Sequence, residues 1–385
     1  MNFDFLLPVE DNIVAHTALL PNQSLGKSIH IHSKKNGLPD IENAHIAIIG
    51  VKDGRRAVDN FGTGDSFSPI RQYLYQLFPG NWFSKIVDLG DIPKGNNEDD
   101  TYFAVQEIIA FLIKKKIIPI IIGGGQDLTY ANFRAYDKLE QTVNLTVVDT
   151  KFDLGSIEEE ITSESYLSKI VMDQPNNLFN FNNIGYQTFF NSQEEIDLLE
   201  KLHFDCYRLG EIANDSKLVE PVMRDTDMVS IDIGSVRRAE APANKNAVPN
   251  GFYGEAICSI ARYAGISDKV SSFGIYEYNA KLDEKDQTAH LIAQMIWYFI
   301  EGYNFRINEY PFTSKKDYKK YIVPIDDTTI NFFKSNKSDR WWMEVEHHHN
   351  KVTKRALIPC TYQDYLRARN QVIPERWWKT FRKLN

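Results

Sequence analysis

The sequence has few cysteines, no long apolar run and no excess of positive charge, and each absence excludes a class of protein. Three cysteines in 385 residues (Cys206, Cys258 and Cys360) are too few and too scattered for a disulfide framework or a zinc motif. No apolar run approaches the ~20 residues that a membrane-spanning helix needs, so we expect no membrane insertion. The formal net charge of −8 argues against nucleic-acid binding, which requires a clustered basic surface.

The N-terminus also lacks the basic start of a secretory signal, because Met1 to Glu10 carries Asp4 and Glu10. Together with the scattered cysteines, this predicts a cytoplasmic protein. With 43% hydrophobic and 25% charged residues, the composition is that of a globular protein.

Short apolar segments rich in β-branched residues alternate with segments of helical periodicity. The predicted strands are residues 46–51, 86–90, 117–122, 145–149, 179–185, 228–233 and 270–278. The predicted helices are 69–77, 102–116, 128–139, 194–202, 254–264 and 288–302. Strands that are apolar throughout and alternate with helices are typical of a parallel sheet covered on both faces. The sequence therefore predicts an α/β fold with three α/β/α layers and a mostly parallel sheet.

Composition divides the chain into three parts. Residues 1–43 are mixed and contain several turn formers, and we expect an N-terminal arm there. Residues 44–305 hold the alternating strands and helices and are expected to form the α/β domain. Residues 306–385 contain four of the six tryptophans and predict a C-terminal extension packed on or beside that domain.

Polar residues at the strand ends are the candidates for a site, because ligands of open parallel sheets bind at the carboxyl ends of the strands. Asp149, Lys151 and Asp153 follow one strand at a spacing that directs alternate side chains to one side. Asp232 interrupts the apolar run of another strand, and a buried carboxylate needs a partner or a metal ion. Gly123 to Gly125 follows a third strand but lacks the spacing of a phosphate-binding loop, so we interpret it as a tight turn.

Six segments, taken in order, resemble the motifs of the ureohydrolases, the family of arginase, agmatinase and formimidoylglutamase. They are Ser68 to Arg71, Asp88 to Ile92, Gly123 to Gln126, Asp149 to Leu154, Ser230 to Gly234 and Tyr276 to Asn279. The third and fourth are most similar to the formimidoylglutamase branch. The resemblance covers roughly residues 46–303. It implies an arginase-like fold in which two manganese ions activate a bridging hydroxide to hydrolyse C–N bonds of guanidino or formimino groups.

Three of the six positions that the resemblance assigns to metal ligands carry unsuitable residues. Gln126 and Lys151 stand where the family has histidine, and Gly234 stands where it has aspartate. An amide is a poor ligand for these metals and an ammonium group is none. We therefore expect no cofactor, or at most one divalent cation, Mn or Mg, on the remaining ligands, which are Asp149, Asp153 and Asp232. Lys151 is expected to place its ammonium group beside Asp149 or Asp232 as a built-in counterion.

This degenerate metal site favours a pseudoenzyme without catalytic residues, one that acts through protein or small-molecule binding. Glu277 matches the family's carboxylate that engages the guanidinium or formimino group, so a small amidine or an amino-acid-like ligand is a possible occupant. The alternative is a formimidoylglutamase- or arginase-like hydrolase of linear amidine C–N bonds with an altered or single-metal site.

The two tryptophan pairs of the extension, Trp341-Trp342 and Trp377-Trp378, indicate an interaction surface, because tryptophan and arginine are common at interface hot spots. A protein partner or self-assembly is therefore expected. Arg376 to Lys379 is predicted to face the solvent, whereas Trp341-Trp342 is predicted to pack on the body. His347 to His349 lacks surrounding carboxylates and predicts a solvated loop rather than a metal site.

Overall fold

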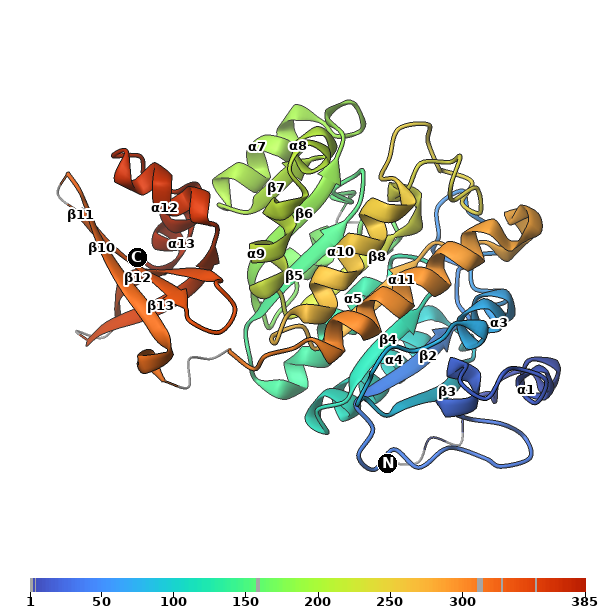
Figure 1. Cartoon of the computed structure of the whole chain (residues 1–385). Coiled ribbons are helices and arrows are strands. Elements are labelled where there is room, and N and C mark those ends of the chain that lie inside the picture. Colours follow the sequence, from blue (N-terminus) through green and yellow to red (C-terminus); the bar gives the residue numbers. More distant parts are fainter. Residues whose placement is uncertain (1–2, 4, 157–159, 310–313, 327, 350–351) are drawn as a thin grey trace.

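The structure, a computed structural model, describes residues 3, 5–156, 160–309, 314–326, 328–349 and 352–385 (Figure 1). Its largest element is a parallel nine-stranded sheet with the order β1-β3-β2-β4-β9-β8-β5-β6-β7. The strands are β1 (His30–Ile31), β2 (Ile46–Val51), β3 (Ile86–Ile92), β4 (Ile118–Ile122), β5 (Val143–Val148), β6 (Leu178–Tyr186), β7 (Asp205–Arg208), β8 (Met228–Asp232) and β9 (Ser272–Tyr276).

Helices cover both faces of this sheet, as the alternation of side chains along its strands requires. Ile46 and Ile48 pack with one group of helices, which includes α3 (Ser68–Gln76), α10 (Gly254–Ile266) and α11 (Gln287–Asn304). Ala47 and Ile49 pack on the other face, with helices that include α4 (Glu98–Lys114) and α5 (Leu128–Arg134). The further helices of this part are α1 (Asp11–Thr17), α2 (Leu25–Ser28), α6 (Tyr166–Met172), α7 (Gln193–Lys201), α8 (Leu209–Asn214) and α9 (Val219–Arg224). The predicted three-layer α/β fold is confirmed.

Helix α4 begins four residues before the predicted start. The side chain of Asn97 accepts a hydrogen bond from the backbone N–H of Asp100 at 2.8 Å, and the Asp100 carboxylate bonds back to the backbone of Asn97. This capping box satisfies N–H groups that the first turn of a helix leaves without partners. A polar segment that the apolar periodicity did not include is therefore helical.

The C-terminal part forms a second, antiparallel sheet of four strands, β10 (Tyr318–Ile325), β11 (Thr328–Ser335), β12 (Trp341–His349) and β13 (Val352–Cys360). Two helices follow, α12 (Tyr362–Arg369) and α13 (Glu375–Leu384). Because His347 to His349 are the last residues of β12, the prediction of a loop there is wrong. The second sheet lies beside the end of the large sheet that carries β6 and β7 (Figure 1).

The extension is attached to the α/β part through Arg224 at the end of α9. Its guanidinium donates to the backbone oxygens of Trp341 at 3.1 Å and Cys360 at 3.0 Å, and its carbon lies 4.6 Å from the ring centroid of Trp342. Lys379 adds an ion pair with Asp205 at 3.1 Å. The contacts join α9 and β7 to the second sheet and α13.

The prediction that Arg376 to Lys379 faces the solvent is wrong for three of its four residues. Trp377 is 6% exposed and donates its indole N–H to the backbone oxygen of Glu344 at 2.8 Å. Arg376 lies 3.8 Å from Asp225 in the α/β part, and Lys379 pairs with Asp205. Trp341 and Trp342 are buried as predicted, so of the four tryptophans only Trp378, which is 46% exposed, remains accessible to a partner.

None of the helices in the described residues has the length and apolar character needed to cross a membrane.

A buried ion pair joins α3 to the sheet through Asp88 and Asp91, two aspartates of the segment 88–92 that resembles a ureohydrolase motif. Arg71 donates to Asp88 at 2.9 Å, to the backbone oxygen of Gly90 at 3.0 Å, and pairs with Asp91 at 2.7 Å. Tyr75 donates its hydroxyl proton to the same Asp88 at 2.8 Å. Asp88 and Asp91 therefore stabilise the packing of α3 and do not face the pocket described below.

Truncating Arg71 should destabilise the protein strongly, because it leaves two carboxylates in the interior without their cationic partner. We expect Arg71→Met to lower the free energy of unfolding by about 3–5 kcal/mol, measured by urea denaturation. Arg262→Met is the matched control, since Arg262 pairs with Glu301 at 2.8 Å near the surface and should cost under about 1 kcal/mol. Equal losses in the two variants would contradict the structural role of Arg71.

Candidate functional site

The carboxyl ends of four adjacent strands, β4, β9, β8 and β5, meet around one cavity of about 230 Å³. Parallel neighbours end at the same edge of the sheet, so residues far apart in sequence come together there. The seven residues that the sequence analysis assigned to the pocket all line this cavity: Gln126, Asp149, Lys151, Asp153, Asp232, Gly234 and Glu277. Among the other lining residues are Ser163, Glu164, Phe190 and Asn246, which the sequence analysis did not identify.

Glu277 is held at the floor of the pocket by two donors. It accepts a hydrogen bond from the backbone N–H of Gln126 at 2.9 Å and another from the side-chain amide of Asn60 at 2.8 Å. Its backbone is left-handed, with φ of 68°, and Asn60 also donates to its carbonyl oxygen at 2.9 Å. Strained backbone of this kind is retained where the surroundings fix it, as at ligand sites. The sequence analysis did not identify Asn60, because it lies 217 residues from Glu277 in a loop without a motif.

Asp149 and Asp153 approach each other at the end of β5. Asp149 accepts a hydrogen bond from the backbone N–H of Lys151 at 3.1 Å. Asp153 has a left-handed backbone, with φ of 56°, and its Oδ2 is buried without a hydrogen-bond partner among the described residues. Burial raises the pKa of both carboxyl groups, and the negative charges of Asp149 and Asp232 raise the pKa of Asp153 further.

Asp232 ends β8 and faces the same cavity. It accepts hydrogen bonds from the backbone N–H of Gly234 at 2.7 Å and from the Asn244 amide at 3.3 Å. Burial, followed by the charges of Asp149 and Glu277, raises its pKa well above the ordinary value. The pocket therefore gathers three buried carboxyl groups and the partly buried Asp232, and these cannot all be ionised without a compensating cation.

Lys151 does not supply that cation, and the prediction of a built-in counterion is wrong. Its ammonium group forms an ion pair with Glu164, and its side chain is 39% exposed at the rim of the pocket. An ammonium group beside solvent and Glu164 keeps much of its hydration, which burial beside Asp149 would remove. Among the described residues, no lysine, arginine or histidine forms an ion pair with any of the four carboxyl groups.

The side chains present do not fit a pair of manganese ions. Gly234 offers no donor, the Lys151 ammonium is directed to Glu164, and Gln126 has a buried amide nitrogen without a partner in the described structure. In the same residues, no three His, Cys, Asp or Glu side chains are arranged to hold a metal ion. The donor set is three aspartates and an amide. It differs from the set of histidines and aspartates that the resemblance implies for a two-manganese site.

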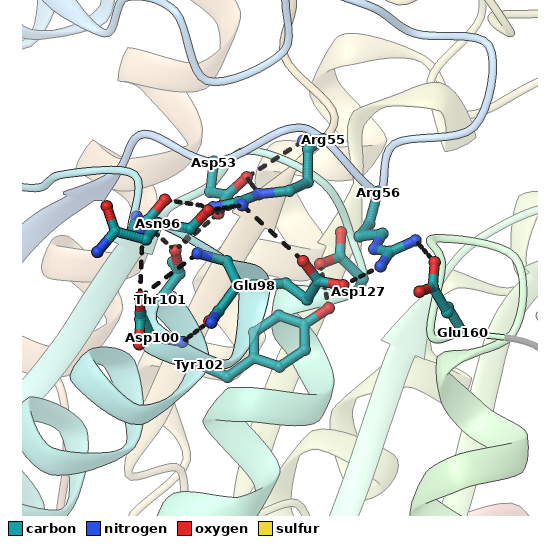
Figure 2. Close-up of polar contacts among 12 residues, drawn as sticks. Asp53, Arg55, Arg56, Asn96, Glu98, Asp100, Thr101, Tyr102, Asp127 and Glu160 are labelled. Carbon is teal, nitrogen blue, oxygen red and sulfur yellow. Dashed lines mark hydrogen bonds and ion pairs between the residues drawn. The ribbon is translucent and has the colours of Figure 1, made fainter.

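A loop that follows β2 contacts the pocket through Asn60, which donates to Glu277, and it is fixed by the ion-pair network of Figure 2. Arg55 pairs with Asp53 at 2.6 Å, and Thr101 donates to the same carboxylate at 2.7 Å. Arg56 joins Glu98 on α4 to Glu160, so it connects the loop to the segment that precedes Ser163 and Glu164 of the pocket lining. The network stabilises one conformation of the loop.

The glycine run after β4 is explained by the close approach of this loop. The backbone N–H of Gly125 donates to the oxygen of Asp53 at 3.1 Å, and a side chain at Gly124 would collide with that oxygen. Beside it, Tyr102 donates to Asp127 at 2.7 Å (Figure 2), and burial raises the pKa of Asp127 to about 7. The run therefore serves close packing, in agreement with the interpretation as a tight turn.

The chain is similar to known proteins over this part. The family model described as Arginase family matches residues 44–301. A formimidoylglutamase of Staphylococcus aureus is 25% identical over 253 residues, which cover 62% of this chain and 79% of that protein.

Solved structures show the same fold. The formimidoylglutamase of Bacillus subtilis has a TM-score of 0.66 at 19% identity and covers 74% of this chain and 92% of its own. The formiminoglutamase of Trypanosoma cruzi with Mn²⁺ has a TM-score of 0.63 at 18% identity and covers 69% and 96%. An agmatine ureohydrolase of Thermoplasma volcanium has a TM-score of 0.60 at 18% identity and covers 75% and 96%. The resemblance to the ureohydrolases, with formimidoylglutamases among the similar proteins, is confirmed.

Removing the ionisable group at Glu277 should flatten the pH dependence of stability. Burial raises the pKa of Glu277 from 4.5 to about 8, so the folded protein holds a proton that the unfolded chain releases. The stabilisation of the folded state by this bound proton is fully present below about pH 4.5 and is lost as the pH rises through about 8. From pH 5 to 9 we expect the wild type to lose a few kcal/mol more than Glu277→Gln in ligand-free denaturation. Parallel pH profiles for the two proteins would contradict the burial of this group.

Proposed function

The chain belongs to the arginase family, and on this premise we propose that its pocket binds a small organic cation of the amidine class without two-metal hydrolysis. The supporting observation is a cluster of four carboxyl groups, the buried Asp149, Asp153 and Glu277 and the partly buried Asp232, none of which forms an ion pair within the described chain. A cationic ligand would neutralise this cluster, as a metal pair would in a complete ureohydrolase site.

An amidinium group suits the pocket because it is planar and carries several N–H donors at fixed angles. Such groups pair with carboxylates through parallel charge-assisted hydrogen bonds. The unpartnered Oδ2 of Asp153 is one acceptor for such a donor. Glu277 is a second acceptor, held in place by Asn60 and the backbone of Gln126. These contacts recognise the charge and shape of the ligand and involve no bond cleavage.

A second candidate function is hydrolysis of a linear amidine C–N bond with a single metal ion. The relatives named above support a hydrolase, because three of the four are formimidoylglutamases, the fourth is an agmatine ureohydrolase, and one of the structures carries Mn²⁺. Asp149, Asp153 and Asp232 are oxygen donors, which a hard divalent cation such as Mg²⁺ accepts. The comparisons thus favour the hydrolase, whereas the donor set of this chain favours binding, and metal content together with turnover separates the two.

We expect the dialysed protein to hold less than one transition metal per chain and to bind agmatine, arginine or formiminoglutamate without turnover. Elemental analysis, isothermal titration calorimetry and an assay of released product measure the three quantities. Asp153→Asn should weaken binding at least about ten-fold, because it removes a buried ionic partner of the ligand. The control Asp99→Asn removes an exposed carboxylate on α4 and should leave binding unchanged. Stoichiometric metal with turnover would establish the hydrolase and refute the binding protein.

Restoring the missing ligands should create a manganese site. We expect the triple variant Gln126→His, Lys151→His, Gly234→Asp to retain manganese after dialysis. A Cβ atom at Gly234 would lie 3.0 Å from the Asn244 amide and 3.1 Å from Asp232 Oδ1, side-chain atoms that can shift. The matched control replaces Gly234→Asp by Gly234→Ala and should bind less metal. A triple variant that melts like the wild type and still takes up no manganese would contradict the assignment of these positions.

A further inference from the structure

The C-terminal extension contains a second cavity, a hollow of about 540 Å³ between the second sheet and α12. None of its residues belongs to the carboxylate pocket, and nothing in the proposed function uses it. We propose that this hollow binds single-stranded nucleic acid.

The charge of the extension is opposite to that of the rest of the chain. Residues 306–385 contain 17 Lys and Arg against 9 Asp and Glu, whereas residues 1–305 contain 27 against 43. The whole-chain charge of −8, from which we expected no nucleic-acid binding, therefore averages two oppositely charged parts. A basic part of a protein attracts phosphate groups even where the complete chain is acidic.

The register of the second sheet places cations beside aromatic rings. Lys319 pairs with Lys334 across β10 and β11, and Lys334 pairs with Trp341 of β12, so the three side chains form one row on the same face. Tyr321 follows two residues after Lys319, on this face, and its ring centroid lies 5.1 Å from that of Trp341. The row therefore combines two positive charges with an aromatic surface.

Helix α12 closes one side of the hollow with two more rings. Tyr365 stacks on Trp341, with ring centroids 4.9 Å apart and planes at 26°. Tyr362 stacks in turn on Tyr365 at 5.9 Å and is 50% exposed, so its ring is open to a ligand. Trp341 is buried at the base, and the ring centroid of the exposed Tyr362 lies 5.4 Å from that of Trp341.

Cations are available at the rim of the hollow. The Arg369 guanidinium lies 5.9 Å from the ring of Tyr365, and the Lys319 ammonium lies 5.3 Å from the ring of Tyr321. In the part of the chain that the structure describes, neither forms an ion pair. Lys334 is neutralised by the exposed Asp339 at 2.5 Å. At least two positive charges thus remain for an anion.

Aromatic faces next to unpaired cations fit a ligand that alternates flat rings with negative charges. Bases of a single strand stack on exposed tyrosine rings, and phosphates pair with lysine and arginine. An acidic peptide would use the cations and leave the rings without partners. A duplex would offer its phosphates but keep its bases stacked inside. Single-stranded nucleic acid is the occupant whose chemistry uses both features of the hollow.

Fluorescence anisotropy with the full chain and a short fluorescein-labelled oligothymidylate tests the proposal. We expect Tyr362→Ala to weaken binding by about five-fold or more, since base stacking on one ring contributes that much. Arg369→Gln should reduce the slope of log affinity against log salt by about 0.7, the value for one phosphate contact on a single strand. Arg369→Lys keeps the charge and should keep the slope, which separates this effect from a fold defect.

The matched controls are Trp378→Ala and Arg382→Gln, an exposed ring and a cation 5.6 Å from it on α13, outside the hollow. Both should bind like the wild type. Equal weakening by the controls, equal affinity for a duplex of the same sequence, or equal displacement by polyglutamate would each overturn the proposal. Absence of binding at low salt would also overturn it. None of these results depends on the carboxylate pocket. The two proposals are therefore tested independently, and either can fail without the other.

Discussion

The gathering of four carboxyl groups, three of them buried and Asp232 partly buried, at one edge of the sheet is the constraint on which the site depends. An ionised carboxylate away from water costs several kcal/mol unless it is paired. The chain pairs Asp149, Asp232 and Glu277 only in part, through backbone and amide N–H groups, and leaves one oxygen of Asp153 without a donor in the described structure. Burial and mutual repulsion raise the pKa of these carboxyl groups, so bound protons or a bound cation can supply the remaining compensation. A cation that binds to this pocket is therefore expected to displace protons.

The scaffold does not depend on that compensation, and this is why the family fold persists at about 18–25% identity while half of the expected ligands differ. The strands are held by apolar packing on both faces. Separate charge networks hold the neighbouring elements, Arg71 with Asp88 between α3 and β3 and Arg55 with Asp53 in the loop after β2. The side chains of Gln126 and Lys151, and the position of Gly234, take part in none of these networks, so exchange there leaves the scaffold in place. Fold similarity therefore carries little information about the chemistry of this site.

Much of the fold could be predicted because fully buried parallel strands are continuous apolar runs, and the polar residues that end them mark the pocket. The short strand β7 (Asp205–Arg208) could not, because it is polar at both ends and owes its place to pairing with β6. The partners of the individual side chains could not be predicted from the sequence either. Lys151 turns to Glu164, Glu277 is held by Asn60, and Trp377 faces its own sheet, and each depends on a neighbour that only the tertiary structure supplies. Residue types and strand ends are readable from sequence, but side-chain directions are not.

The division of charge between the two parts of the chain also limits where an anion can bind. The acidic α/β part attracts the basic extension, and Arg376 and Lys379 meet Asp225 and Asp205 at their contact. Those cations are neutralised by docking and are not available to a ligand. The same acidic surface repels phosphate groups, so an anion approaching the extension gains most where rings and unpaired cations coincide, at the hollow beside α12. The charge that holds the extension in place thus directs an anionic partner to that hollow and away from the contact between the two parts.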